Sequence, residues 1–301
     1  MLKKINKAVL LFIILIPFVL SSCKANHSES EQSSFVLTSF YPIYLITSFI
    51  ADGSGLEIRN MAQPQTGCLH DYQLSTTDVR LMSQASVFVI NGSGMENSFM
   101  EQASQNTGVK IIDSSEGLNS ELPEGHSHND GHDHGGANSH IWTSLEMVQT
   151  QAKNICSGLS EIYPDYADIF SHNADNFISR AESLAKTEDN SKHFNAISFN
   201  EAFEYMLEDN GAHIEYTIEI DENISPTAKE MAEISDRAKE AGISAIFCAD
   251  DSSLNFANAI SREINSPVYI LDPLTYGISS NDYFDAMEKN ISIIKEAAEN
   301  D

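Results

Sequence analysis

The residues with the clearest chemistry are histidines gathered in the stretch 126–142 (HSHNDGHDHGGANSHIW). Four of the chain's ten histidines fall within nine residues of it: His126, His128, His132 and His134. Neutral imidazole is a good ligand for borderline metals such as zinc, and His-rich tracts are typical of metal binding. A solvated polar loop and an expression tag are the alternatives, although a tag is usually a terminal run of consecutive histidines. We therefore expect a mobile loop that handles a metal.

Four short stretches place a donor side chain where a predicted strand or helix gives way to a loop. They are 67–72 (GCLHDY) with His70, 139–142 (SHIW) with His140, 199–203 (FNEAF) with Asn200, and 271–274 (LDPL) with Asp272. The stretches are far apart in the sequence. Because open α/β sheets bind ligands at the carboxyl ends of their strands, we expect these side chains to converge in one cleft.

The elements that must position these residues alternate along the chain, which predicts parallel βαβ units. Strands are expected at 35–38, 56–61, 87–90, 109–112, 195–199, 213–218, 245–248 and 268–271. Helices are expected at 43–51, 77–85, 201–208, 254–264 and 283–299, with another that is capped by Ser225-Pro226 and ends at Ala241. An apolar stripe that begins after Pro164 predicts a helix over 164–186, about 35 Å long and able to connect two lobes.

This pattern predicts an α/β protein of two βαβ lobes with parallel sheets, joined by one long rigid bridging helix, with the metal cleft between the lobes. We expect a signal peptide at 1–22, a polar spacer at 23–34, a first lobe at 35–143 that carries the His-rich loop 124–137, a helical segment at 144–190 and a second lobe at 191–301.

The first 22 residues differ from the rest of the chain. Three lysines precede an almost wholly apolar run, 9–20, which is too short for a comfortable membrane span and therefore indicates a signal peptide. The run ends in Leu-Ser-Ser-Cys at 20–23, which resembles a bacterial lipobox. That resemblance implies cleavage before Cys23 and a lipid anchor on the cysteine. A plain secretory signal with an incidental cysteine is the alternative.

Composition narrows the possible partners. The chain has 301 residues, of which 42% are hydrophobic, and its net charge is −27 from 44 acidic and 17 basic side chains. A nucleic-acid partner is excluded because a phosphate backbone requires a basic surface. An acidic surface instead raises the local concentration of cations.

Four motifs, taken together, resemble the solute-binding lipoproteins of zinc and manganese ABC transporters. The motifs are HDYQLSTTD at 70–78, HIW at 140–142, FNEAFEYM at 199–206 and LDPL at 271–274. The likeness extends from about residue 35 to the C-terminus, and the acidic His-rich loop before His140 is a feature of the zinc-type members. The resemblance implies two α/β lobes bridged by a long helix, with the metal held between them.

The resemblance also implies metal ligands at four positions: His70, His140, Asn200 and Asp272. Asn200 departs from the family, because zinc-type members usually have His there and manganese-type members Glu. An amide oxygen is a weak donor for zinc, so Glu201, Cys68 or a loop histidine could complete the shell. Asn200 is also a good N-cap for a helix that begins at Glu201. The loop histidines are expected to form a weak, exchangeable collecting tract.

The function implied by the resemblance is extracytoplasmic capture of Zn²⁺ and its delivery to an ABC transporter permease, with no catalysis. We expect a monomer held at the outer side of the cell membrane by its lipid. Mn²⁺ or another divalent cation is an alternative cargo, although manganese favours oxygen donors over histidines. A secreted zinc hydrolase would need an open metal position and a base, and the motif HExxH is absent. A surface adhesin is a further alternative.

Overall fold

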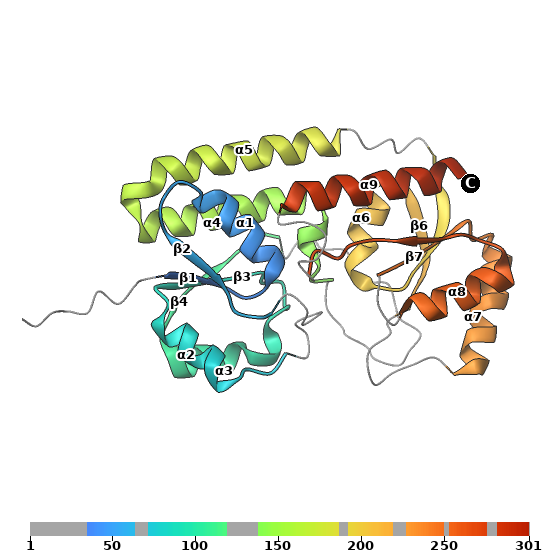
Figure 1. Ribbon diagram of the computed structural model, residues 1–301, viewed down its shortest axis with the longest axis horizontal. Helices are drawn as coiled ribbons and strands as arrows, with labels where there is room; N and C mark the ends of the chain where they lie inside the picture. Colours follow the sequence, from blue (N-terminus) through green and yellow to red (C-terminus); the bar gives the residue numbers. More distant parts are fainter. Residues whose placement is uncertain are drawn as a thin grey trace, which may run out of the picture. The chain divides into compact units, whose positions relative to one another are not determined.

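The structure is a computed structural model that describes residues 35–63, 72–118, 138–186, 192–218, 227–249, 253–275 and 282–300. Residues 34–301 form one compact unit (Figure 1). The expected signal peptide, Cys23, the stretch with Cys68 and His70, and the four loop histidines lie outside the described residues. Among the helices that are described, none is both long and apolar enough to cross a membrane.

The first sheet is parallel, with the strand order β2-β1-β3-β4. Its strands are β1 (Phe35–Thr38), β2 (Glu57–Asn60), β3 (Val87–Ile90) and β4 (Lys110–Asp113). Its helices are α1 (Tyr41–Ala51), α2 (Thr76–Gln84), α3 (Asn97–Thr107) and α4 (Met147–Ile162). Alternate strand residues face opposite layers: Val36 and Val89 pack with α1 and α4, whereas Leu37 and Phe88 pack with α2 and α3.

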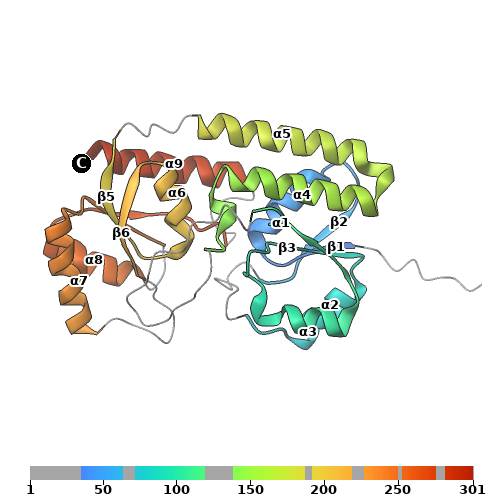
Figure 2. The same cartoon turned by 180° about the vertical axis from the view of Figure 1, so that it is seen from behind.

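The second sheet repeats this topology, with the order β6-β5-β7-β8. Its strands are β5 (Phe194–Ser198), β6 (Ala212–Thr217), β7 (Ala245–Cys248) and β8 (Val268–Ile270). Its helices are α6 (Glu204–Asp209), α7 (Ala228–Ala241), α8 (Ser253–Ile264) and α9 (Tyr283–Asn300). Helices α7 and α8 share one core with Ile246 and Cys248, while α6 and α9 share the other with Phe247 (Figure 2).

The two sheets are joined by a helical segment in which α5 (Ala167–Ala185) is the longest helix. The short 3₁₀ turn η3 (Pro164–Tyr166) leads into it, as the proline predicts. Helix α5 packs along α4 and also contacts α1 and α9 (Figure 1). One apolar cluster runs through this segment, from Val36 of the first sheet by way of Phe177 to Phe247 of the second. The two lobes therefore share a continuous core.

The predicted fold class is confirmed: two parallel sheets with helices, in a two-lobed α/β arrangement. Each predicted strand is present, and no strand end differs from its predicted position by more than one residue. Helix α3 was not predicted, because NSFMEQASQNT is largely polar and its first residue has no capping side chain before it. The predicted cap of α7 was wrong: Thr227 is the N-cap, in a capping box with Glu230, and not Ser225-Pro226.

Candidate metal site

The carboxyl end of β3 positions the backbone beside His140. Asn91 directly follows the strand and is fully buried. Its amide nitrogen donates to the carbonyl of Ser139 at 2.9 Å, and its amide oxygen accepts from Gln151 Nε2 at 3.1 Å. Because β1 and β3 flank the point where the strand order reverses, this is the edge at which an open α/β sheet binds its ligands.

His140 is buried, with 3% of its surface exposed, and is held on two sides. Its ring lies 5.0 Å from that of Trp142, between centroids, at an interplanar angle of 56°. Its Nδ1 lies 2.7 Å from the amide oxygen of Asn138, which also accepts the backbone N–H of His140 at 2.9 Å. The position and the orientation of this imidazole are therefore both fixed.

Trp142 joins the His140 stretch to the Asp272 stretch. The indole N–H donates to the carbonyl of Pro273 at 3.0 Å, and the hydroxyl of Tyr283 donates to the carbonyl of Trp142 at 2.8 Å. Trp142 is fully buried, and Phe40 packs edge-on against its ring. These contacts bring two stretches together that are about 130 residues apart in the sequence.

Asp272 follows β8 and is fixed by a local turn. Its Oδ1 accepts the backbone N–H of Leu274 at 2.8 Å, and its own N–H and C=O pair with the side chain of Asn290 at 2.9 and 2.8 Å. Leu274 has a φ of 63°, a conformation that a leucine adopts only when its surroundings impose it. Burial raises the pKa of Asp272, although the N–H of Leu274 and the charge of Lys289 act in the opposite direction.

Asn200 occupies the N-cap of the 3₁₀ turn η4 (Glu201–Phe203). Its side-chain oxygen accepts the backbone N–H of Ala202 at 2.8 Å. The capping role that the sequence allowed is therefore present, and it takes up one lone pair of the amide oxygen. The carbonyl of the next residue, Glu201, accepts from Asn138 at 3.1 Å. This contact connects the third stretch to the His140 stretch.

Three of the four predicted stretches are thus tied together by hydrogen bonds, and the His70 stretch lies outside the described residues. Within the described ranges, no three His, Cys, Asp or Glu side chains are grouped closely enough to hold a metal ion. Tyr41 was not among the predicted residues. Burial, together with the nearby Tyr44 and Asp272, raises the pKa of its hydroxyl.

Two buried carboxylates were not predicted from the sequence: Glu96 and Glu204, which are 1% and 4% exposed. Glu96 accepts the backbone N–H groups of Asn91 and Gly92 at 2.8 and 3.0 Å, and burial raises its pKa to about 7. Glu204 accepts from the side chain of Asn138 at 2.9 Å. The polar run Asn-Gly-Ser-Gly at 91–94, which follows a buried strand, was the only sequence signal for the first of them.

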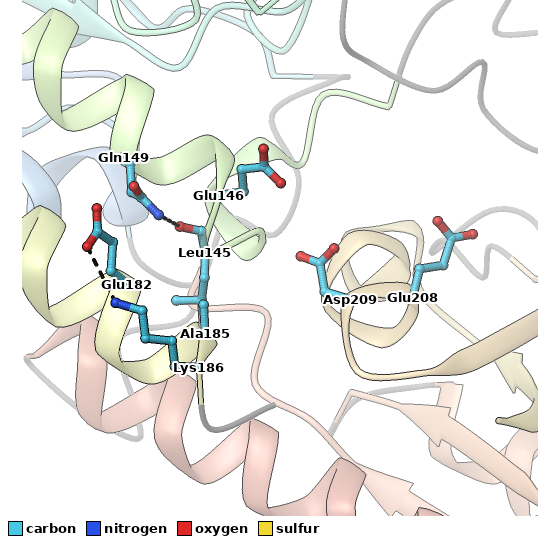
Figure 3. A pocket seen from close by; sticks show the side chains of 8 residues that line it. All are labelled: Leu145, Glu146, Gln149, Glu182, Ala185, Lys186, Glu208 and Asp209. Carbon is cyan, nitrogen blue, oxygen red and sulfur yellow. Dashed lines mark hydrogen bonds and ion pairs between the residues drawn. The ribbon is translucent and has the colours of Figure 1, made fainter. Parts of the chain in front are cut away.

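A separate acidic pocket of about 550 Å³ opens between the start of α4 and the ends of α5 and α6 (Figure 3). It is lined by Leu145, Glu146, Gln149, Glu182, Ala185, Lys186, Glu208 and Asp209. Burial raises the pKa of Asp209 to about 6, although the hydroxyl of Ser144 donates to it at 3.2 Å. None of the predicted metal ligands lines this pocket, so it is distinct from the candidate site.

Two relatives match most of this chain in sequence. Zinc-binding protein AdcA of Streptococcus pyogenes serotype M3 is 26% identical over an alignment of 319 positions, which covers 96% of this chain and 61% of the relative. High-affinity zinc uptake system protein ZnuA of Bacillus subtilis is 25% identical over an alignment of 315 positions, which covers 95% of this chain and 96% of that protein. The chain spans about three fifths of the length of the AdcA relatives that it matches.

Solved structures agree on the fold. The laminin-binding adhesin Lmb of Streptococcus agalactiae, in a mutant structure, superposes with a TM-score of 0.75 at 23% identity, over 88% of this chain and 99% of that one. A crystal structure of ZnuA gives a TM-score of 0.70 at 24% identity, over 87% and 99%. Residues 36–297 match one protein family over nearly the whole described part of the chain. The chain belongs to that family, zinc-uptake complex component A, periplasmic.

Proposed function

We propose that this protein captures Zn²⁺ outside the cytoplasm and delivers it to an ABC transporter permease. The observation that carries the proposal is the convergence of the His140, Asn200 and Asp272 stretches, which hydrogen bonds from Asn138 and Trp142 hold together. The family match and the zinc-binding names of AdcA and ZnuA support zinc as the cargo. In this function the metal ion is coordinated and released with no covalent bond formed or broken, so no catalytic group is needed.

His70, His140 and Asp272 are the proposed first ligands. Zinc prefers imidazole and carboxylate donors in a tetrahedral shell, and these three side chains supply that set. Asn200 provides the fourth donor through the second lone pair of its amide oxygen, or yields the position to Glu201, Cys68 or a loop histidine. The acidic, His-rich loop 124–137 collects zinc ahead of this site.

The relatives support an extracytoplasmic location, since AdcA of Streptococcus pneumoniae is named a zinc-binding lipoprotein. For this chain, lipidation of Cys23 stays a prediction. We also propose that the protein acts as a monomer. Its proposed division is the one given above, with the signal peptide at 1–22, the first lobe, the bridging segment at 144–190 and the second lobe.

Manganese is the second candidate cargo, because Asn200 contributes an oxygen where zinc-type members usually have a nitrogen donor.

Replacement of His140 by alanine tests the site directly. We expect the zinc affinity of His140→Ala, measured by competition with a chromophoric chelator, to fall by at least about tenfold, since one ligand of the shell is lost. His213→Ala is the matched control, because His213 is exposed on β6 and lies outside the site. Parallel titration with Mn²⁺ decides between the two cargoes. Unchanged zinc affinity in His140→Ala would remove His140 from the site.

A further inference from the structure

The imidazole of His140 can present only one nitrogen to a metal, and its surroundings decide which one. The amide oxygen of Asn138 faces two groups of His140: the backbone N–H at 2.9 Å and Nδ1 at 2.7 Å. An amide oxygen only accepts hydrogen bonds, so Nδ1 must carry the proton. A neutral imidazole protonated at Nδ1 has its lone pair on Nε2.

The orientation of the Asn138 amide is fixed by what lies on its other side. Its nitrogen donates to Glu204 Oε2 at 2.9 Å and to the carbonyl of Glu201 at 3.1 Å. A flipped amide would turn its oxygen toward these two acceptors and its nitrogen toward the backbone N–H of His140, which is a donor in either tautomer. These three contacts would then be lost, so the network selects the orientation in which the amide oxygen faces His140.

Glu204 anchors this arrangement from the second lobe. It is the first residue of α6, and its other carboxylate oxygen accepts the hydroxyl of Thr217 on β6. Asn138 is 6% exposed, and the hydroxyl of Tyr205 donates to its backbone carbonyl at 2.8 Å. A chain of hydrogen bonds therefore runs from Thr217 through Glu204 and Asn138 to His140. It passes from the second sheet to His140, whose neighbour Ser139 is bonded through its carbonyl to Asn91 at the end of the first sheet.

We propose that Asn138 and Glu204 are positioning residues that hold His140 as the Nδ1–H tautomer, so that Nε2 is the metal donor. The part of this inference that concerns metal rests on the proposed function; the tautomer does not. A polar partner behind a metal-binding histidine fixes its ring and its tautomer, and removal of such a partner typically costs about 10- to 100-fold in metal affinity. Here the partner is an amide, and the carboxylate behind it belongs to the other lobe.

The tautomer can be read directly from the ¹⁵N chemical shifts of the ring nitrogens in metal-free protein labelled at histidine. The pH is set about two units above the ordinary imidazole pKa of about 6.5, and His140→Ala identifies the signals. We expect the Nδ1–H pattern for His140 in the wild-type protein. The Nε2–H pattern there would overturn the inference, whatever the metal affinity, and this measurement needs no variant that might misfold.

Three variants distinguish a role in orienting the His140 ring from a general role in stabilising the backbone around residues 138–140. Asn138→Ala should lose the tautomer preference and bind zinc about 10- to 100-fold more weakly. Glu204→Gln keeps the shape of the side chain but removes its charge, and we expect a smaller, several-fold decrease in zinc affinity. Tyr205→Phe is the matched control: it removes the hydrogen bond to the Asn138 carbonyl but leaves the amide intact, so tautomer and affinity should stay near wild type.

The outcomes distinguish the two proposals. If wild-type protein binds no zinc tightly but shows the Nδ1–H tautomer, the proposed function fails and the positioning role stands. If wild-type protein binds zinc tightly and Asn138→Ala matches it in tautomer and affinity, the positioning role fails and the proposed function stands. If Tyr205→Phe and Asn138→Ala lost the tautomer preference and zinc affinity equally, the effect would be purely structural, and this result would also overturn the inference.

Discussion

At the residue scale, buried polar side chains hold the backbone of the candidate site in place, and Glu96 is the clearest example. It accepts the backbone N–H groups of Asn91 and Gly92 after β3, and the side chain of Asn91 in turn donates to the carbonyl of Ser139, next to His140. A carboxyl group that is almost fully removed from water favours its protonated form, which explains a pKa of about 7 in spite of two N–H donors. The stability of this edge of the sheet should therefore depend on pH.

The sign of that dependence follows from proton binding. The folded protein holds the Glu96 proton more tightly than the unfolded chain, in which the pKa is near its ordinary value of 4.5. The stabilisation is thus complete below about pH 4.5 and is lost as the pH rises through about 7, to a total of about 3 kcal/mol. We expect the unfolding free energy of wild type, minus that of Glu96→Gln, to fall over this range in chemical denaturation. A difference that is constant with pH would contradict the assignment.

Residues of this kind also mark the limit of what the sequence predicts. His140 and Asp272 could be proposed because each stands in a recognisable motif at the end of an element. Asn138, Glu96 and Glu204 could not, because nothing in a polar residue's local sequence shows that it will be buried. Asn138 meets Glu204 across 66 positions of the chain, a contact that only the folded topology creates.

At the element scale, the close approach of the β3–α3 turn to the end of β4 depends on Gly92. A Cβ atom there would lie 1.9 Å from Asp113 Oδ1 and 2.3 Å from Ser115 Oγ. Gly108, which ends α3, also has a positive φ, but a Cβ there would meet nothing within 4 Å. The two glycines thus share a conformational requirement and differ in steric space.

We expect Gly108→Ala to lower the unfolding free energy by about 1–2 kcal/mol, the cost of a left-handed conformation for a residue with a Cβ. Gly92→Ala should cost about 1–3 kcal/mol more, because two side chains at the end of β4 must also move. Chemical denaturation of the two variants side by side measures the difference. Equal losses of unfolding free energy in the two variants would show that Asp113 and Ser115 move aside for the methyl group at no measurable cost.

The elements themselves were largely predictable, for a physical reason. Strands buried on both faces of a parallel sheet are short, continuous apolar runs, and VFVI at β3 and AIFC at β7 show this clearly. Helix α5 was visible in its apolar stripe, of which Phe170, Ala174, Phe177 and Ala181 are buried. Helix α3 was not predicted because its sequence is otherwise polar: Phe99 and Ala103 are buried in the core, and Met100 packs against it half-buried.

At the scale of the whole molecule, the two lobes are fastened to each other by a shared core and by the polar contacts around residues 138–142. The described residues on either side of 119–137 meet in one small apolar cluster, in which Leu118, Ile141 and Tyr205 are buried. Because both ends are anchored there independently of the segment, the fold should not need its full length. Five residues can span up to about 17 Å, which suffices to connect anchors in the same cluster.

Deletion of residues 124–137 therefore tests whether tight zinc binding depends on the His-rich loop or only on the site formed by the two lobes. We expect the shortened protein to unfold at the same denaturant concentration as wild type and to retain one tightly held zinc after dialysis, measured by elemental analysis. Weakly bound zinc should decrease, because His126, His128, His132 and His134 are removed. If the fold survives but the tight zinc is lost, a loop histidine supplies the donor that Asn200 does not. The fourth ligand of the high-affinity site would then come from the loop and not from Asn200.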